Sequence, residues 1–213
     1  MNQEELKNQL ARGIDALGLS LDKTRQLLLL EYLQLLVKWN KVHNLTAVRD
    51  PEQMVTHHLL DALSVLPHLT ETKRLLDVGS GGGIPGLLLA IARPDWEVHL
   101  IDSNHKKTAF LQQVAIELQL ANVTVHTGRI EALQDVPPFD TVISRAFSEL
   151  ADFVKLAKNM VAEGGYFQAM KGVYPFEEIA HLPAGFKVEE VIPLNVPELN
   201  AERHLVKISK TAA

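Results

Sequence analysis

The glycine-rich segment 77–86, with the sequence DVGSGGGIPG, limits the possible folds of this chain more than any other feature. It follows the apolar run RLLDV (74–78), which predicts a buried strand, and it leads into an apolar helix predicted over 85–92. Glycines let a backbone turn tightly and approach a ligand, and a helix N-terminus offers unpaired N–H groups and a positive dipole end. Four glycines within residues 79–83 are hard to explain as a turn alone, so the segment predicts a ligand-binding loop.

The acidic residue Asp102 points to a nucleoside as part of that ligand. It ends the next predicted strand, EVHLID (97–102), nineteen residues after Gly83. In α/β folds an acid at this position binds the hydroxyl groups of a ribose. Alone it is equally well explained as a cap at the end of a strand, but its combination with the glycine loop favours the ribose.

The spacing of the glycines fits two classes of cofactor. Residues 81–86 satisfy G-x-G-x-x-G, the dinucleotide-binding pattern, and residues 77–83 satisfy D-x-G-x-G-x-G, the pattern of methyltransferases that use S-adenosylmethionine. Asp77 separates the two, because a carboxylate suits an ammonium and a sulfonium group but is unfavourable beside a pyrophosphate. We therefore expect S-adenosyl-L-methionine as the cofactor and S-adenosyl-L-homocysteine as its product.

From residue 73 onward, short apolar strands alternate with helices, which is typical of a mostly parallel sheet with helices on both faces. The last two strands, 186–194 and 204–210, have no helix between them and should form an antiparallel hairpin. The other elements expected here are the helices 104–119 and 149–161 and the strands 123–127, 139–144 and 166–171. Residues 71–213 thus predict an α/β class I methyltransferase domain, Rossmann-like, with a seven-stranded sheet.

The first seventy residues predict an N-terminal helical extension packed on that domain. Apolar residues recur at helical spacing over 6–17 and over 27–37, and Asp50-Pro51 is typical of the start of a third helix that runs to about Leu66. Trp39 could stack on a nucleic acid, but we expect it in the core.

Composition excludes several kinds of chemistry. The chain has no cysteine, which rules out disulfides, thiolate metal sites and thiolate nucleophiles. A net charge of -5 argues against a broad nucleic-acid-binding surface, although it allows a local basic pocket. No apolar run is long enough for a membrane span and no secretory signal is evident, so we expect a cytoplasmic protein without membrane partners. We also expect a monomer.

The segment SRAF (144–147) follows the fourth predicted strand, where class I enzymes face the methyl group. It lacks the Asn/Asp-Pro-Pro-aromatic motif of exocyclic amine methylation, since Pro137-Pro138-Phe139 precedes the strand and is interpreted as a loop. Methylation of an atom with a free lone pair remains open, as does methylation of an oxygen or nitrogen activated by some other base. Guanine N7 suits the first case, because it has a free lone pair and can accept a methyl group without losing a proton.

Several segments together resemble one known family, the bacterial RsmG (GidB) proteins. They are WNKVHNLTAV (39–48), HHLLDAL (57–63), the glycine loop, DSNHKKTAFLQ (102–112), GRIEAL (128–133), PPFDTVISRAFSEL (137–150), MKG (170–172) and VPELNAERHLVKISK (196–210). The resemblance spans nearly the whole chain in order. It implies methylation of a guanine N7 in the decoding-region loop of 16S rRNA, by direct transfer without a covalent enzyme intermediate, with 16S rRNA or the small ribosomal subunit as partner.

Candidate site residues follow from the motifs and from this resemblance. The expected cofactor-binding residues are Asp77, Gly79, Ser80, Gly81, Gly83, Ile84, Asp102, Ile130, Glu131 and Arg145. Without the resemblance Glu131 would be interpreted as an ordinary surface acid. We expect Arg145, Lys171 and Arg203 to form a small basic mouth that binds RNA, with Arg145 and Lys171 positioning the substrate and no general base.

Two further patterns have simpler explanations. Arg145 could instead pair with Glu149, four residues on, but its place after the fourth strand favours the ligand crevice. His57 or His58 can meet Asp61 on the predicted third helix. Adjacent histidines point about 100° apart on a helix, so we expect a structural or RNA-facing role there and no metal.

Three other functions remain compatible with parts of the sequence. They are a methyltransferase acting on a small molecule or a protein, a nicotinamide- or flavin-dependent oxidoreductase, and a non-catalytic ribosome-binding factor that keeps the fold. Asp77 opposes the oxidoreductase, and the intact glycine loop with Asp102 opposes a dead cofactor site.

Overall fold

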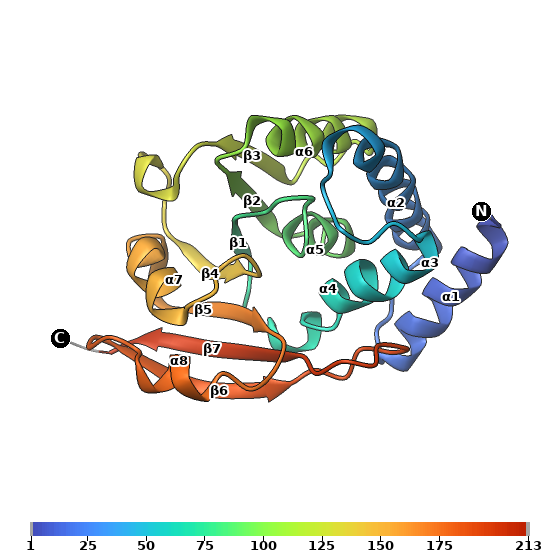
Figure 1. Cartoon of the computed structure of the whole chain (residues 1–213). Helices are drawn as coiled ribbons and strands as arrows, with labels where there is room; N and C mark the ends of the chain where they lie inside the picture. The colour runs from blue at the N-terminus through green and yellow to red at the C-terminus, as the bar shows by residue number, and fades with distance from the viewer. Residues whose placement is uncertain (1, 212–213) are drawn as a thin grey trace.

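A seven-stranded sheet with strand order β3-β2-β1-β4-β5-β7-β6 runs through the centre of the molecule (Figure 1). The computed structural model describes residues 2–211. The strands are β1 (Arg74–Val78), β2 (Glu97–Asp102), β3 (Val123–Thr127), β4 (Phe139–Ser144), β5 (Val161–Lys171), β6 (Phe186–Pro193) and β7 (His204–Lys210). Neighbours among β1 to β5 are parallel, whereas β7 is antiparallel to both β5 and β6. The predicted class I fold with a terminal antiparallel hairpin is confirmed.

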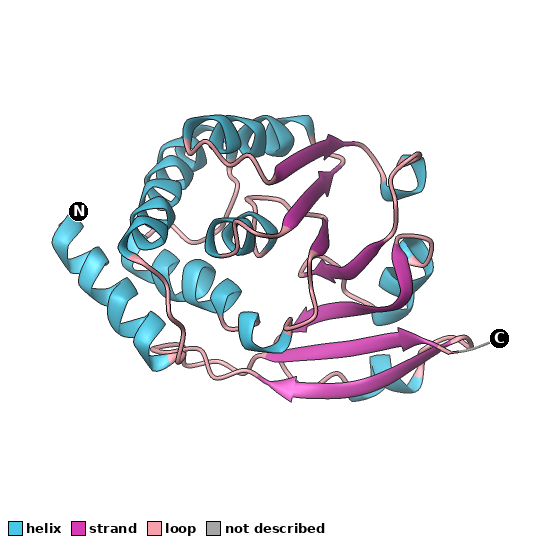
Figure 2. Ribbon diagram, turned by 180° about the vertical axis from the view of Figure 1, so that it is seen from behind, coloured by secondary structure: helices cyan, strands magenta, loops and turns pink. Residues whose placement is uncertain are grey.

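Helices cover both faces of the sheet, with a thick layer on one side and a thin one on the other (Figure 2). The thick layer contains α1 (Gln3–Ala16), α2 (Lys23–His43), α3 (Pro51–Met54), α4 (Asp61–Leu63), α5 (Gly86–Ala92) and α6 (His105–Glu117). The thin layer contains α7 (Leu150–Ala157), α8 (Phe176–Ala180) and the 3-10 turn η3 (Ile130–Ala132). Each layer has its own hydrophobic cluster, because alternate residues of every strand point to opposite faces.

The N-terminal helices share one hydrophobic cluster with α5, α6 and the sheet. Trp39 packs there, with its ring 5.6 Å from that of Phe110, as expected for a core residue. The division into residues 1–70 and 71–213 is thus not marked by a separate core, and the boundary stays a prediction.

The third helix begins as predicted and then changes its geometry. The side chain of Asp50 accepts a hydrogen bond from the N–H of Glu52, and Pro51 occupies the first turn. The chain then forms a π-helical turn, η1 (Val55–Leu60), before α4, and a 3-10 turn, η2 (Leu66–His68). Such π-helical turns are rare and redirect side chains relative to a regular α-helix.

Two predicted boundaries between α7 and β5 are wrong. The helix ends at Ala157 rather than at residue 161, and β5 already begins at Val161, which pairs with Phe139. Gly164 and Gly165 therefore lie inside the strand, next to a shift in register. A Cβ at Gly165 would lie 2.7 Å from the carbonyl oxygen of Asp140, so the close approach of β4 requires glycine. Helix α8 was not predicted.

The glycine loop is connected to the N-terminal helices by a hydrogen bond from Tyr32 of α2. This side chain is fully buried, and its hydroxyl donates a 2.6 Å hydrogen bond to the carbonyl oxygen of Gly82. Because the bond joins residues fifty positions apart, it fixes the loop against the helical layer.

We expect Tyr32→Phe to lower the free energy of unfolding by about 1–2 kcal/mol, because a buried carbonyl loses its donor. Urea unfolding of the two proteins measures the difference. Tyr174→Phe, at a half-exposed ring, serves as the control. A Tyr32→Phe protein as stable as the wild type would show that the loop does not depend on this bond.

Candidate functional site

The glycine loop adopts backbone conformations that favour glycine. Gly79, Gly81 and Gly83 have φ angles of 75°, 55° and 90°. A Cβ at Gly79 would lie 2.6 Å from that of Ala146, so a larger residue would push the loop from the segment after β4. The loop is thereby held at the carboxyl ends of β1 and β4, where the strand order reverses and α/β folds bind their ligands.

Asp102 fastens this loop from β2. One of its carboxylate oxygens accepts a 2.9 Å hydrogen bond from the N–H of Gly81, and the other accepts one from Asn104, also at 2.9 Å. Each oxygen keeps a second lone pair. The carboxylate is therefore held in a fixed orientation at the edge of the cavity and can still accept hydrogen bonds from the hydroxyl groups of a ribose.

Asp77 lies behind the loop rather than on the wall of the cavity. It is fully buried, one oxygen accepts a 2.9 Å hydrogen bond from the N–H of Gly86, and the other has no hydrogen-bond partner. Burial raises the pKa of Asp77 to about 7, and the bond from Gly86 opposes that rise. Ser80 and Gly83 are also buried, and Ser80 Oγ donates to the carbonyl oxygen of Asp77 at 2.9 Å. A contact between these three residues and the cofactor stays a prediction.

A cavity of about 340 Å³ opens beside the loop at the carboxyl ends of β1, β2, β3 and β4. It is lined by Val78, Gly79, Ile101, Asp102, Ser103, Lys107, Gly128, Arg129, Ile130, Glu131, Ala146, Phe147 and Leu156. The structure thus brings together Gly79, Asp102, Ile130 and Glu131 from the expected cofactor-binding set. Gly81 and Ile84 are partly exposed but do not line this cavity, and Arg145 lies outside it.

Sequence reasoning missed several residues of this wall. Gly128 directly follows β3, has a φ angle of 146°, and donates its N–H to the carbonyl oxygen of Asp102 at 3.0 Å. A Cβ there would meet no atom within 4 Å, so the cavity wall is open at this point. The position of Gly128 at the end of a predicted strand was the available signal. Lys107 carried no comparable pattern, whereas Phe147 lies in the segment 144–147, which was expected to face the methyl group.

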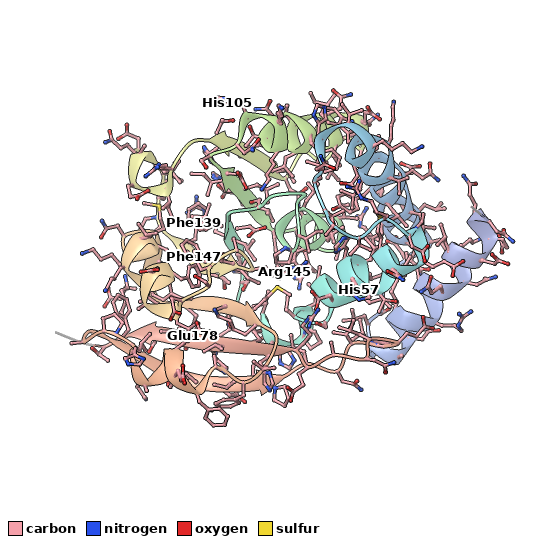
Figure 3. All side chains as sticks on the ribbon, viewed as in Figure 1. His57, His105, Phe139, Arg145, Phe147 and Glu178 are labelled. Atoms are coloured by element: carbon pink, nitrogen blue, oxygen red, sulfur yellow. The ribbon has the colours of Figure 1, made fainter. Side chains whose placement is uncertain are left out.

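The segment after β4 separates the cavity from a second pocket. Ser144 Oγ donates to the carbonyl oxygen of Val78 at 2.7 Å and accepts from the N–H of Ala146 at 3.1 Å, which fixes the direction of the chain. Ala146 and Phe147 then face the cavity, whereas Arg145 points the other way. In Figure 3 Arg145 lies between Phe147 and His57.

The second pocket, of about 190 Å³, gathers the three cations of the expected basic mouth. Arg145 and Arg203 both bind the buried carboxylate of Asp61, at 2.9 and 3.1 Å. Lys171 Nζ donates to the carbonyl oxygens of Phe147 and Ser148 at 3.0 Å and pairs with Glu178 at 2.7 Å. Burial raises the pKa of Asp61, and the two guanidinium groups oppose this rise. The cations are therefore held in place by acids from other elements.

The histidines near Asp61 do not pair with it. Arg145 takes that place and also donates to the carbonyl oxygen of His57 at 3.3 Å, so its salt bridge runs to Asp61 and not to Glu149. His58 Nε2 lies 2.8 Å from Thr46 Oγ1. Burial and the nearby Arg145 lower the pKa of His58 to about 4, so it is neutral at pH 7. Among residues 2–211, no three His, Asp or Glu side chains are grouped as a metal ion would require.

The raised pKa of Asp77 predicts a pH-dependent stability in the absence of ligand. An acid with a raised pKa stabilises the fold in its protonated form, and this stabilisation is lost as the pH rises from the ordinary value towards 7. Asp77→Asn cannot ionise and keeps an acceptor for Gly86. Relative to the wild type, we expect the variant to gain about 2–4 kcal/mol between pH 5 and pH 8. Urea unfolding at both pH values tests this, and a difference that does not change with pH would contradict it.

Comparison with solved structures confirms the fold. A SAM-dependent methyltransferase from Aquifex aeolicus has a TM-score of 0.59 at 19% identity, over 80% of this chain and 96% of the other. A SAM-dependent methyltransferase from Thiobacillus denitrificans, solved with S-adenosyl-L-homocysteine, has a TM-score of 0.53 at 13% identity, over 81% and 96%. Among the described residues, no helix has the length and apolar character to cross a membrane.

Sequence comparison is more specific. "Ribosomal RNA small subunit methyltransferase G" of Chromobacterium violaceum is 58% identical over 94% of this chain and 96% of its own length. The protein of the same name from Neisseria meningitidis serogroup B is 56% identical over 97% and 99%. The family model GidB, described as rRNA small subunit methyltransferase G, matches residues 25–206. With its glycine loop, Asp102 and basic pocket in one class I fold, this chain belongs to the GidB family of rRNA small subunit methyltransferases.

Proposed function

We propose that this chain is an S-adenosylmethionine-dependent methyltransferase that acts on N7 of a guanine in the decoding-region loop of 16S rRNA. One observation carries the proposal: the segment 144–147 has the cavity of about 340 Å³, with Gly79 and Asp102 in its wall, on one side and a basic pocket on the other. A methyl donor bound in the cavity and a polyanionic substrate bound at the basic pocket would thus be separated only by this short segment. The membership in the GidB family supports RNA as that substrate.

The donors and acceptors that line the cavity support S-adenosylmethionine as its ligand. Asp102 offers free lone pairs for the ribose, and Gly79 offers a close backbone approach for the methionine part. Ile130 and Glu131 suit the adenine side, with an apolar contact and an acceptor for the exocyclic amine. When bound, the cofactor supplies an electrophilic methyl group. The chain itself then has to orient a nucleophile and exclude water.

Guanine N7 is a nucleophile that needs no general base. It carries a lone pair and no proton, so positioning and desolvation can supply most of the catalysis. Methylation leaves a positive charge on the base, which a free guanidinium beside N7 would oppose. Asp61 neutralises part of the charge of Arg145 and holds it towards the second pocket. We expect Arg145 and Lys171 to position a phosphate or guanine O6, without a covalent intermediate.

The rest of the substrate is proposed from charge. The net charge of -5 and the few available cations predict weak, salt-sensitive binding to isolated RNA, so folded rRNA or proteins of the small subunit would supply further contacts. We propose that the protein acts on the small subunit or its precursor, as a monomer in the cytoplasm.

Nucleoside analysis tests the proposal. The protein is incubated with radiolabelled S-adenosylmethionine and small subunits from cells that lack this methyltransferase, and the digested rRNA is chromatographed. We expect a labelled N7-methylguanosine peak. Clear cofactor binding without label in RNA would contradict the proposed substrate.

Two variants test the proposed cofactor cavity and the proposed RNA-binding pocket separately. Asp102→Ala should weaken binding of S-adenosyl-L-homocysteine on the order of tenfold to a hundredfold, because a charge-assisted acceptor is lost. Arg145→Ala should leave that affinity unchanged and lower kcat/KM on small subunits by a similar factor. Arg93→Ala, which removes an exposed ion pair with Asp95, is the matched control. Equal losses of cofactor affinity in both variants would contradict the assignment of separate pockets.

A further inference from the structure

A group of exposed apolar side chains lies in the segment 173–176, directly after β5. Val173 is 68% exposed, Tyr174 39% and Phe176 74%. The other large apolar side chains that are exposed in the described part of the chain, Leu27, Val42, Ile116 and Leu156, are spread over α2, α6 and α7. Single exposed apolar residues are ordinary, but three within four positions indicate a surface with a partner.

The aromatic rings of this segment form a contiguous cluster with the ring of His204. The ring centroids of Tyr174 and Phe176 are 4.2 Å apart, and the ring of His204 stands edge-on to Tyr174 at 5.6 Å. His204 itself lines the basic pocket beside Arg145, Lys171 and Arg203. The aromatic face, defined as Tyr174, Phe176 and His204, therefore leads directly out of that pocket.

The segment is anchored at both ends. At its start, His204 Nδ1 bonds to the carbonyl oxygen of Gly172 at 2.7 Å. At its end, Glu178 of α8 pairs with Lys171 and accepts the N–H of Leu150 at 2.9 Å. Pro175 restricts the backbone between the two rings. The rings are thus held in a fixed position relative to the segment after β4, at little further cost in conformational entropy on binding.

From this geometry we infer that the aromatic face stacks an unpaired base of the rRNA, one that lies next to the target guanine. The inference rests on the function proposed above. Exposed aromatic rings beside a cluster of cations are the combination by which proteins bind single-stranded RNA, because the cations attract phosphates and every base has a face to stack. The target atom must be reached in a loop, where the neighbouring bases can be splayed out.

A second copy of this chain fits the aromatic face less well. A stable interface buries about 800 Å² on each partner, which three side chains at the edge of a charged pocket do not provide. A stacked base needs only a ring of similar size. The two arginines stay in reach of phosphates, since the side chains of Arg145 and Arg203 are 35% and 25% exposed and their shared partner Asp61 is buried.

Phe176→Ala tests the inference, since the side chain is mostly exposed and its loss should not affect folding. We expect the Kd for small subunits and the KM for methylation to rise about tenfold, with kcat and the affinity for S-adenosyl-L-homocysteine unchanged. Phe176→Trp should restore the wild-type values, because it retains a stacking ring. Ile116→Ala, at a 72% exposed residue of α6, is the control.

Unchanged binding by Phe176→Ala would overturn the inference, and so would a Phe176→Trp protein that binds no better than Phe176→Ala. Binding of small subunits is measured by sedimentation independently of methyl transfer, so the aromatic face is tested even if the proposed reaction fails. Conversely, wild-type methylation with unaltered Phe176→Ala binding would leave the proposed function standing and remove only the stacking role.

The nature of the partner is read from a photoreactive benzophenone side chain introduced at position 176. We expect irradiation with small subunits to cross-link the protein to rRNA. A cross-link to a ribosomal protein or to a second copy of the chain, with none to RNA, would overturn the inference.

Discussion

The arrangement of the candidate site depends on the salt bridges that the buried carboxylate of Asp61 forms with Arg145 and Arg203. This carboxylate is 1% exposed and lies between Arg145, which follows β4, and Arg203, which precedes β7. A buried charge without a partner is strongly destabilising, so the N-terminal helices, the segment after β4 and the last strand must come together around it. The helical extension is therefore part of the site and not an appendage to it.

This arrangement gives a protein with a net charge of -5 a local positive charge, which a protein that acts on polyanionic RNA needs. Cations spread over the surface would bind nucleic acid without selection. Here three cations are concentrated in one pocket and held by Asp61 and Glu178, so their direction is already fixed for the RNA that we propose they bind. Preorganised groups lose less entropy on binding and need not rearrange as charge develops on the base. The short segment 144–147 then separates this pocket from the cavity proposed for the cofactor.

The features that could be predicted from sequence are local ones. The glycine loop and Asp102 lie in short motifs with fixed spacing, and the strands β1 to β4 follow from apolar runs, so both the fold class and one wall of the cavity could be inferred. The basic mouth was expected because Arg145 and Lys171 lie at the carboxyl ends of two parallel strands, while Arg203 precedes the antiparallel last strand, whose start lies at the same edge.

What could not be predicted depends on contacts between distant residues. The partner of Arg145 is 84 positions away, and the partner of Arg203 is 142 positions away. The local alternative, Glu149 at a helical spacing from Arg145, fails because α7 begins only at Leu150. Similarly, the early start of β5 depends on its pairing with Phe139, and the support of the loop by Tyr32 depends on packing between layers. No local pattern carries such information.

The most direct test of the account is a structure of the protein bound to S-adenosyl-L-homocysteine and the small ribosomal subunit. The account predicts the cofactor in the cavity beside Gly79 and Asp102, with its sulfur facing Ala146 and Phe147. It also predicts a guanine N7 in line with that sulfur, and rRNA phosphates against Arg145, Lys171 and Arg203. A guanine bound away from the segment 144–147, or a basic pocket that faces solvent in the complex, would contradict it.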